Sequence, residues 1–371
     1  MAELFIGLMS GTSLDGVDGV LADFSTSPLS VLAHAGAPLP PDLKAELLAL
    51  NQPGNNELHR AALAANALMR IYAGVVRQLL TISSTTPGHI TALGAHGQTV
   101  RHQPHRHDTT GYTLQLANPA LLAELTGIEV VADFRSRDVA AGGQGAPLVP
   151  AFHQAMFGKA GETIAVLNIG GMANLTVLGP KLTDDVLGFD CGPGNALMDA
   201  WCLRHLRQPF DAHGAWAASG QVQTDLLQTL LAEPYFALPP PKSTGRDLFN
   251  PNWLDRQLGG FVDVAPVDVQ ATLTELTATA CAADVKNFAS QSQKLIVCGG
   301  GAFNTHLLAR LQALLPGVTV RLSDAYGLPA QQVEATAFAW LARKAVQREA
   351  LALQSITGTR GARVLGAIYP A

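Results

Sequence analysis

Cysteine is scarce in this sequence. Only four of the 371 residues are cysteine, and they lie apart, with no C-x-x-C pair and no histidine at zinc-finger spacing. This pattern excludes a disulfide-stapled scaffold and argues against a structural zinc site. We therefore expect a reducing compartment, the cytoplasm.

Long hydrophobic runs and basic clusters are also lacking. No apolar run approaches the ~20 residues that a helix needs to cross a bilayer. The segment Met1–Leu4 lacks the positive charges that begin a secretory signal peptide. Only 14 % of the residues are charged and the net charge is −5, so the chain lacks the basic character that nucleic acid or an anionic membrane attracts. The sequence thus predicts a soluble protein without nucleic-acid or membrane partners.

Apolar residues and glycine are abundant. The hydrophobic fraction is 48 % and there are 36 glycines, enough at this length for two domains with separate cores. Short apolar strands alternate with helical stretches, which is typical of α/β layers with sites at strand ends. We place the boundary at the glycine-rich loop 141–147. This gives an amino-terminal α/β domain at 1–140 and a carboxy-terminal α/β domain at 141–371, whose last helix returns to the cleft.

Three glycine turns follow apolar strands. The sequence contains no P-loop, no complete G-x-G-x-x-G after a strand and no G-x-S-x-G, so those common phosphate, dinucleotide and hydrolase motifs are excluded. The turns are at Gly11–Gly16, Gly170–Gly171 and Gly299–Gly301. Glycine after a strand lets backbone N–H groups approach an anion closely. One such turn can be an ordinary hairpin, but three fit a nucleotide held between two α/β domains.

Two acids stand out from their surroundings. Asp190 is expected at a strand end, followed by a glycine and proline turn that opens a helix over 196–205. A carboxylate there can act as a general base, or it can merely cap the helix. Glu334 lies among small apolar residues of a predicted helix, where a solvated face explains it equally well.

Histidines occur in two different settings. His96 and Gln98 follow a buried strand and could hydrogen-bond a polyol or a carboxylate, although His96 could also be structural. A second group lies in a polar stretch, where metal binding and a solvated loop are the two alternatives. It consists of His102, His105, His107 and Asp108. The proline-rich segment 239–246 is expected to be a stiff exposed loop.

These motifs occur in an order that resembles one known family. The matching segments are Gly7–Asp18, Gly94–Thr99, Gly142–His153, Leu167–Leu175, Gly188–Asn195, Pro241–Arg246, Asp268–Leu273, Val297–Gly301 and Val364–Pro370. Together they closely resemble anhydro-N-acetylmuramic acid kinase, a bacterial cell-wall-recycling enzyme family, over essentially the whole chain. The resemblance implies a two-domain actin-like ATPase fold of the ribonuclease H-like type, with ATP and sugar in the interdomain cleft.

The resemblance also implies a nucleotide site. The implied phosphate contacts in the first turn are Gly11, Thr12, Ser13, Leu14, Asp15, Gly16, Val17 and Asp18. The second turn contributes Gly170, Gly171 and Asn174, and the adenosine side contributes Gly299, Gly300 and Gly301. Mg²⁺ is expected with ATP, but its ligands stay unassigned, because Met9 stands where the superfamily usually carries aspartate.

The family chemistry assigns roles to further residues. By resemblance, Asp190 activates a water that opens the 1,6-anhydro ring, the freed 6-oxygen takes the γ-phosphoryl group of ATP, and Glu334 assists. The implied sugar contacts are His96, Gln98, Asp133, Arg135 and Lys242. The product is N-acetylmuramic acid 6-phosphate, and the family resembles homodimeric enzymes.

Two other hypotheses fit part of the pattern. A glycoside hydrolase would use Asp190 and Glu334 as its carboxylate pair, but it leaves the three glycine turns unexplained. A nucleotide-gated binding module would use the turns without sugar chemistry. Dependence of turnover on ATP separates the three.

Overall fold

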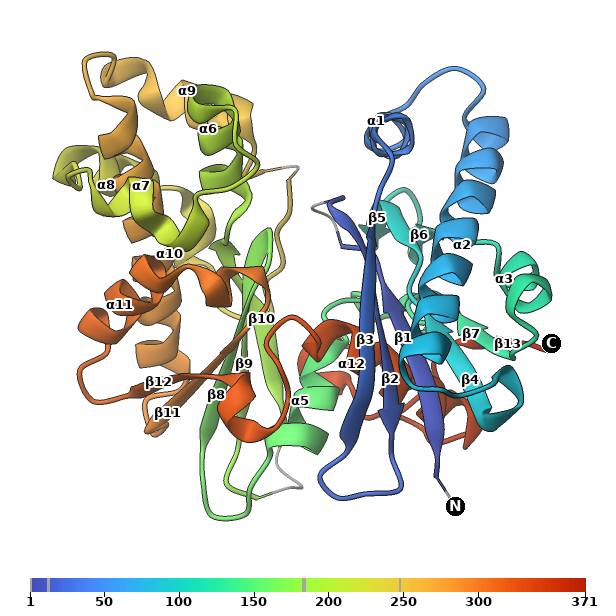
Figure 1. The fold of residues 1–371 in the computed structure, drawn as a ribbon. Coiled ribbons are helices and arrows are strands. Elements are labelled where there is room, and N and C mark those ends of the chain that lie inside the picture. The colour runs from blue at the N-terminus through green and yellow to red at the C-terminus, as the bar shows by residue number, and fades with distance from the viewer. Residues whose placement is uncertain (1, 12–13, 182–184, 247) are drawn as a thin grey trace. The chain divides into compact units, whose positions relative to one another are not determined.

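The chain folds into two compact units (Figure 1). The computed structural model describes residues 2–11, 14–181, 185–246 and 248–371. The first unit consists of Met1–Phe152 with Gln332–Ala371, and the second unit of His153–Gln331. The division therefore differs from the expected one, which assigns everything after residue 140 to one domain. Among the described residues, no helix has both the length and the apolarity to cross a membrane.

The first unit is built on a mixed sheet, six-stranded within the described residues, in the order β13-β7-β4-β1-β2-β3. β1 pairs antiparallel with β2, which confirms the predicted hairpin, and parallel with β4. The strands are β1 (Leu4–Met9), β2 (Gly16–Asp23), β3 (Ser30–Pro38), β4 (Ile90–Ala95), β7 (Val130–Ala132) and β13 (Ala367–Tyr369), with a separate hairpin of β5 (Gln98–Pro104) and β6 (Gly111–Leu116).

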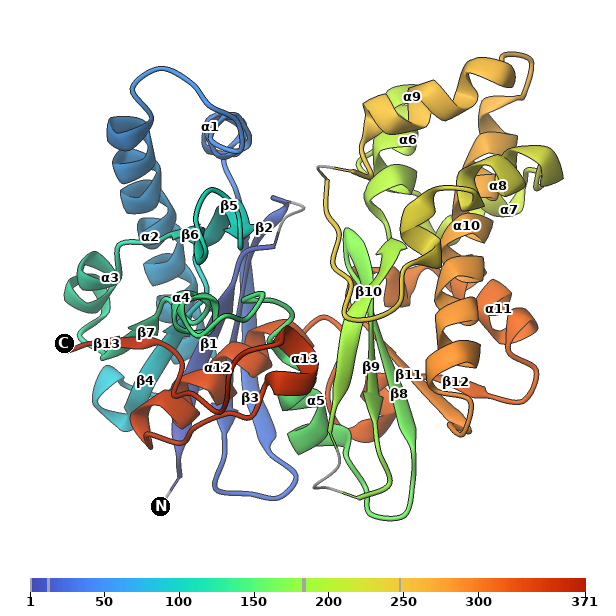
Figure 2. The same ribbon diagram turned by 180° about the vertical axis from the view of Figure 1, so that it is seen from behind.

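Two long helices cover opposite faces of this sheet (Figures 1 and 2). A Cβ on Gly19 of β2 would meet side chains of α2, whereas a Cβ on Gly7 of β1 would overlap the carbonyl oxygen of Ala335 in α12. Gly7 and Leu8 are neighbours in β1, Leu8 pairs with Gly19, and adjacent strand residues point to opposite faces. The helices of this unit are α1 (Pro41–Ala49), α2 (Glu57–Ile82), α3 (Pro119–Thr126), α4 (Ser136–Ala140), α12 (Val333–Val346) and α13 (Gln354–Thr357).

The close approach of α12 explains why the end of the chain belongs to the first unit. A Cβ on Gly94 of β4 would overlap the carbonyl oxygen of Phe338, just as a Cβ on Gly7 would overlap that of Ala335. Glycine at both positions lets the helix backbone lie directly on the strands. α12 is thus a layer of the first unit rather than part of the second unit's core.

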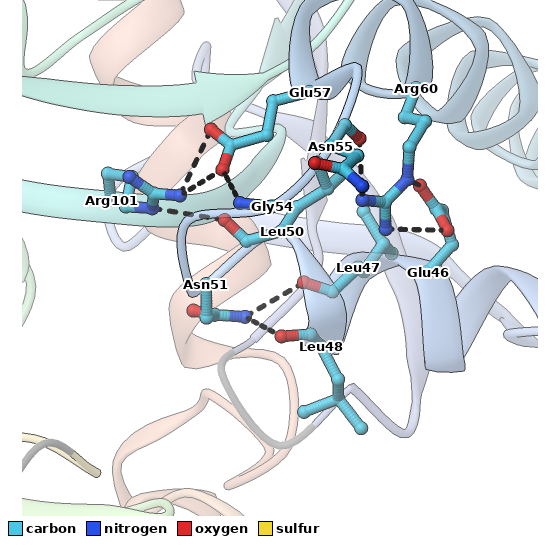
Figure 3. Close-up of polar contacts among 10 residues, drawn as sticks. All are labelled: Glu46, Leu47, Leu48, Leu50, Asn51, Gly54, Asn55, Glu57, Arg60 and Arg101. Atoms are coloured by element: carbon cyan, nitrogen blue, oxygen red, sulfur yellow. Dashed lines mark hydrogen bonds and ion pairs between the residues drawn. The ribbon is translucent and has the colours of Figure 1, made fainter.

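Ion pairs tie the first two helices to β5 (Figure 3). Nη2 of Arg101 lies 3.2 Å from both carboxylate oxygens of Glu57, and its Nε donates to the Leu50 carbonyl at 3.1 Å. Nε and Nη2 of Arg60 donate to the two carboxylate oxygens of Glu46, at 2.7 and 3.1 Å. Two-point pairs of this kind fix geometry as well as charge. They hold the strand that begins at Gln98.

The second unit is built on another mixed sheet, five-stranded within the described residues, in the order β10-β9-β8-β11-β12. β8 and β9 form an antiparallel hairpin, and β11 runs parallel to β8 and β12. The strands are β8 (Ile164–Ile169), β9 (Met172–Leu178), β10 (Leu187–Pro193), β11 (Lys294–Cys298) and β12 (Thr319–Leu322). This arrangement confirms the predicted α/β class and the repeated strand-turn-strand pattern.

α10 packs against this sheet, and α6, α7, α8 and α11 contact α10. α10 is buried along most of its length, and Oγ1 of Thr277 donates to the carbonyls of Pro193 and Gly194 at 3.0 and 3.1 Å. α10 thereby braces the turn that follows β10. The helices are α6 (Ala196–Leu206), α7 (Ala215–Ala218), α8 (Thr224–Leu231), α9 (Pro251–Gln257), α10 (Pro266–Phe288) and α11 (Thr305–Leu314), while α5 (Val149–Phe157) crosses the boundary between the two units in the sequence.

Candidate functional site

The first glycine turn and two predicted sugar contacts meet in the first unit. β1 and β4 are parallel neighbours, so the segments after their carboxyl ends lie at the same sheet edge. Oγ of Ser10 donates to the carbonyl of Gly97 at 3.0 Å, and Nε2 of Gln98 donates to the carbonyl of Gly11 at 3.2 Å. The structure thus brings the predicted phosphate turn next to His96–Gln98.

The remaining members of the first turn differ in exposure. The side chains of Leu14 and Val17 are buried in the core of the first unit, which leaves their backbone for any ligand contact. Asp15 is exposed with its carboxylate 3.4 Å from Nζ of Lys44, Gly16 begins β2, and Asp18 is also exposed. Two predicted members lie outside the described residues, Thr12 and Ser13.

A neutral histidine and an arginine form the polar centre of this region. Nε and Nη2 of Arg135 lie 3.1 and 3.0 Å from Nε2 of His96, and Nη1 donates to the carbonyl of Gly145 at 2.8 Å. Burial, and then the charge of Arg135, lower the pKa of His96 to about 3. The imidazole is therefore neutral at pH 7, and its Nε2 accepts hydrogen bonds from the guanidinium.

Two buried polar atoms here have no hydrogen-bond partner within the described part of the chain. They are Nδ1 of His96 and Oε1 of Gln98. Buried polar groups are nearly always paired in folded proteins, so these two atoms are candidates for contact with a ligand. Nδ1 of His96 can donate a hydrogen bond and Oε1 of Gln98 can accept one, which suits the hydroxyl and amide groups of a sugar.

Two further predicted residues also lie in the first unit. Asp133 is exposed, has a φ of +55°, and precedes Arg135 by two positions. Glu334 is half-buried in the first turn of α12, next to Ala335, which contacts β1 at Gly7.

In the second unit, the other two glycine turns meet at the start of α6. The backbone N–H groups of Asn195 and Ala196 donate to the carbonyls of Gly170 and Gly171 at 2.8 and 3.1 Å. A Cβ on Gly301 would lie 3.1 Å from Oδ1 of Asn195. The second and third turns are therefore neighbours, as a shared nucleotide site requires.

Close packing explains why glycine begins the third turn. Gly299 has a φ of +83°, and a Cβ on it would overlap Oδ1 of Asn168 and the backbone of Ile169. Both the backbone conformation and the available space therefore restrict this position to glycine. Gly300 is exposed, so the turn presents its backbone to solvent.

Asp190 lies inside β10 rather than at its end. β10 continues through Pro193, and its pairing with β9 shifts between Asp190 and Gly192, so a bulge stands where the sequence predicts a strand end. Asp190 pairs directly with Asn174, and paired residues on neighbouring strands share a face of the sheet. A predicted catalytic residue and a predicted nucleotide contact therefore lie side by side.

The carboxylate of Asp190 is held by the segment after the proline run. Its Oδ2 accepts from Oγ of Ser243 at 3.1 Å and from the backbone N–H of Thr244 at 2.9 Å. Its main chain donates to the carbonyl of Lys242 at 3.1 Å and accepts from the hydroxyl of Tyr235 at 2.8 Å. Since α6 begins only at Ala196, these contacts favour an oriented carboxylate over a helix cap.

Lys242 is buried, in contrast to the expected exposed loop and sugar contact. Its Nζ lies 3.5 and 3.4 Å from the two carboxylate oxygens of Asp284 and 5.3 and 5.6 Å from the ring centres of Tyr235 and Phe189. The segment 239–246 contains no helix or strand, as expected. Its lysine points inward because an acid and two aromatic faces compensate the buried charge.

Tyr235 and Asp284 escape prediction from the sequence. Asp284 is a single acid on a buried helix face, and Tyr235 follows a proline in a short helical turn. The only signal is an acid within the apolar stretch Ala278–Val285, which sequence reasoning could have marked as a buried partner for a lysine.

The histidine-rich stretch forms the turn between β5 and β6. His105 and His107 have φ of +60° and +70°, and Nδ1 of His102 lies 2.9 Å from Oγ1 of Thr113. Within residues 2–11, 14–181, 185–246 and 248–371, no group of three or more His, Cys, Asp or Glu side chains could hold a metal ion. We therefore assign no magnesium ligand.

Comparison with known proteins identifies the family. Residues 3–371 match the sequence model of anhydro-N-acetylmuramic acid kinase. The chain is 66 % identical to proteins of that name from Albidiferax ferrireducens and Variovorax paradoxus, with 100 % of this chain and 100 % and 99 % of those proteins covered. A solved structure of (R)-2-hydroxyglutaryl-CoA dehydratase component A from Acidaminococcus fermentans is 12 % identical, with a TM-score of 0.49 and coverage of 91 % of this chain and 96 % of that one. The full-length match shows that the chain belongs to the anhydro-N-acetylmuramic acid kinase family and is a kinase.

Proposed function

We propose that the chain uses ATP and water to convert 1,6-anhydro-N-acetylmuramic acid into N-acetylmuramic acid 6-phosphate and ADP, in the recycling of peptidoglycan. The observation that carries this proposal is the oriented carboxylate of Asp190. It is held by Ser243 and Thr244, faces the same side of the sheet as Asn174, and precedes the start of α6, where the second and third glycine turns meet.

In the proposed reaction, Asp190 takes a proton from water as the water oxygen bonds to the anomeric carbon. The bond between that carbon and the 6-oxygen breaks, and the 6-oxygen bonds to the γ-phosphorus of ATP. The bond from this phosphorus to the β-γ bridging oxygen breaks, and ADP leaves. Phosphoryl transfer depends mainly on alignment and charge stabilisation. The proposed reaction therefore needs only one well-oriented general base, Asp190.

The glycine turns supply the proposed nucleotide contacts. We assign the phosphates to the first turn and to Gly170–Gly171, and the adenosine to Gly299–Gly301. Mg²⁺ would neutralise phosphate charge. The described side chains offer no three-ligand cage for it, which fits an ion that would be held mainly by the nucleotide phosphates and water.

The sugar contacts in the proposal come from the first unit. The Nδ1–H of His96 donates to a sugar oxygen, Oε1 of Gln98 accepts from a sugar hydroxyl or amide, and Arg135 pairs with the lactyl carboxylate. Asp133 and Glu334 are proposed to assist at the sugar. A homodimer and a cytoplasmic location complete the proposal, and sedimentation velocity tests the former.

Mass spectrometry of the products tests the proposed function. The purified protein is incubated with the anhydro-sugar and magnesium, with and without ATP. We expect a product heavier by one water and one phosphoryl group, only with ATP, and its loss in Asp190→Asn.

The alternatives give different results. Ring opening without phosphate, independent of ATP, would support the glycoside hydrolase. Nucleotide-dependent thermal stabilisation without any product would support the binding module.

A further inference from the structure

Lys242 and Asp284 form a buried ion pair in the second unit. The side chain of Lys242 is 2 % exposed and that of Asp284 is 8 % exposed. The two aromatic rings of Phe189 and Tyr235 face the ammonium group. The ammonium is enclosed within the second unit, so this geometry offers little access for a direct contact with sugar.

The same lysine begins the segment that holds Asp190. The carbonyl of Lys242 accepts from the N–H of Asp190, and the next two residues, Ser243 and Thr244, donate to the Asp190 carboxylate. Tyr235 joins both features, because its hydroxyl bonds to the Asp190 carbonyl and its ring packs on the ammonium. One inward-pointing side chain is thus linked to the hydrogen bonds that Asp190 makes with Lys242, Ser243, Thr244 and Tyr235.

Without an anchor, this segment has few means of keeping its position. It contains no helix or strand, and Ser243 and Arg246 on either side of Thr244 are exposed. A carboxylate held by such a segment keeps its direction only if the segment is fixed elsewhere. The ion pair, on α10, supplies that fixed point.

We infer that Lys242 is a positioning residue, which anchors the segment 242–244 to α10 through Asp284 and so orients the carboxylate of Asp190. This inference rests on the proposed function for its catalytic consequence. Its structural part, the anchoring of the segment, holds or fails independently of the reaction.

Lys242→Met tests the inference, because methionine keeps the length of the side chain but removes its charge. We measure amide hydrogen exchange at Asp190 and Thr244, together with kcat and KM for sugar and ATP. Lys294→Met is the matched control, since it removes a lysine of the same unit that pairs with the partly exposed Glu162. We expect faster exchange at both amides and a fall in kcat of at least about tenfold with little change in KM in Lys242→Met only.

A second variant separates positioning from mere charge compensation. Lys242→Met with Asp284→Leu removes both charges, and buried pairs replaced by apolar residues often keep or gain stability. We expect Lys242→Met alone to lower the melting temperature and the double variant to bring it back toward that of the wild type. In the double variant, amide exchange at Asp190 and Thr244 stays fast and kcat stays low. This variant also serves if Lys242→Met alone does not fold.

Several outcomes would overturn the inference. Wild-type exchange at Asp190 and Thr244 in Lys242→Met would show that the segment needs no anchor, and a raised sugar KM with unchanged exchange would make Lys242 a substrate contact. Wild-type exchange rates and a wild-type kcat in the double variant would show that apolar packing alone holds the segment 242–244. If the wild type forms no phosphorylated sugar, the proposed function fails, whereas the exchange data still decide the anchoring.

Discussion

Two buried histidines are neutral in the folded protein. Burial lowers the pKa of His153 to about 3, as burial and Arg135 do for His96. For His96, neutrality matters for the proposed sugar contact, because Nε2 accepts from Arg135 and Nδ1 must then carry the ring proton. For His153, whose Nδ1 contacts Oγ1 of Thr176 at 2.9 Å, the consequence is for stability.

His153 is predicted to destabilise the protein in acid. The pKa of His153 in the folded protein lies below the ordinary value of 6.5. Between these two pKa values, His153 binds a proton in the unfolded chain but not in the folded chain. Stability is unaffected above pH 6.5 and is lost as the pH falls from 6.5 toward 3, by up to about 1.4 kcal/mol per pH unit. Urea unfolding between pH 7 and 4 should show a smaller acid loss in His153→Gln than in the wild type.

The exposed His59 provides the control for this titration. His59→Gln should keep the wild-type pH dependence of the unfolding free energy. An unchanged acid loss in His153→Gln would contradict the assignment of a buried neutral imidazole.

At the scale of elements, the packing of α12 on the first sheet depends on two glycines. Gly94→Ala places a methyl group against the carbonyl of Phe338, so α12 must shift away from β4. We predict a loss of about 1–3 kcal/mol in unfolding free energy, the usual cost of overpacking. Gly88→Ala, where no atom lies within 4 Å of the new Cβ, should be nearly neutral in the same denaturation experiment. Equal stability of the two variants would contradict the direct contact of helix and strand.

The third glycine turn is predicted to contact the nucleotide. A Cβ on Gly300 would lie 3.7 Å from Nδ2 of Asn195, an ordinary distance, so the fold tolerates a side chain there. Gly300→Val should keep the melting temperature but weaken ATP binding by about tenfold, because bulk blocks the close approach of a ligand. Calorimetric titration measures this, with Gly317→Val as the control at an open position. An unchanged ATP affinity in Gly300→Val would show that the nucleotide does not contact this turn.

Elements were predictable where the signal is local. The hairpin over Leu4–Asp23, the helix Pro119–Thr126 and the strand-turn-strand over Ile164–Leu178 follow from apolar period and glycine position, and the structure confirms them. The bulge at Asp190 escaped prediction, since it depends on the register with β9. The burial of Lys242 does not follow from the local proline-rich sequence, because its partner Asp284 is 42 residues away on α10.

For the whole molecule, the sequence predicts two α/β units, but the boundary it indicates differs from that of the structure. The return of Gln332–Ala371 to the first unit depends on contacts of α12 with strands more than 240 residues earlier, which periodicity does not encode. Family membership came from the order of motifs, and the full-length match confirms it. The roles of Asp190, Glu334 and the glycine turns stay predictions.

Oxygen-18 water provides the most direct measurement of the central claim, that Asp190 activates water for ring opening coupled to phosphoryl transfer. The enzyme, anhydro-sugar and MgATP react in labelled water, and borohydride reduction at once stops exchange at the anomeric carbon. N-acetylmuramic acid 6-phosphate in the same water measures background exchange. We predict one labelled oxygen at the anomeric carbon, none in the phosphoryl group, and no product with Asp190→Asn. Label in the phosphoryl group, or a wild-type yield from Asp190→Asn, would contradict the account.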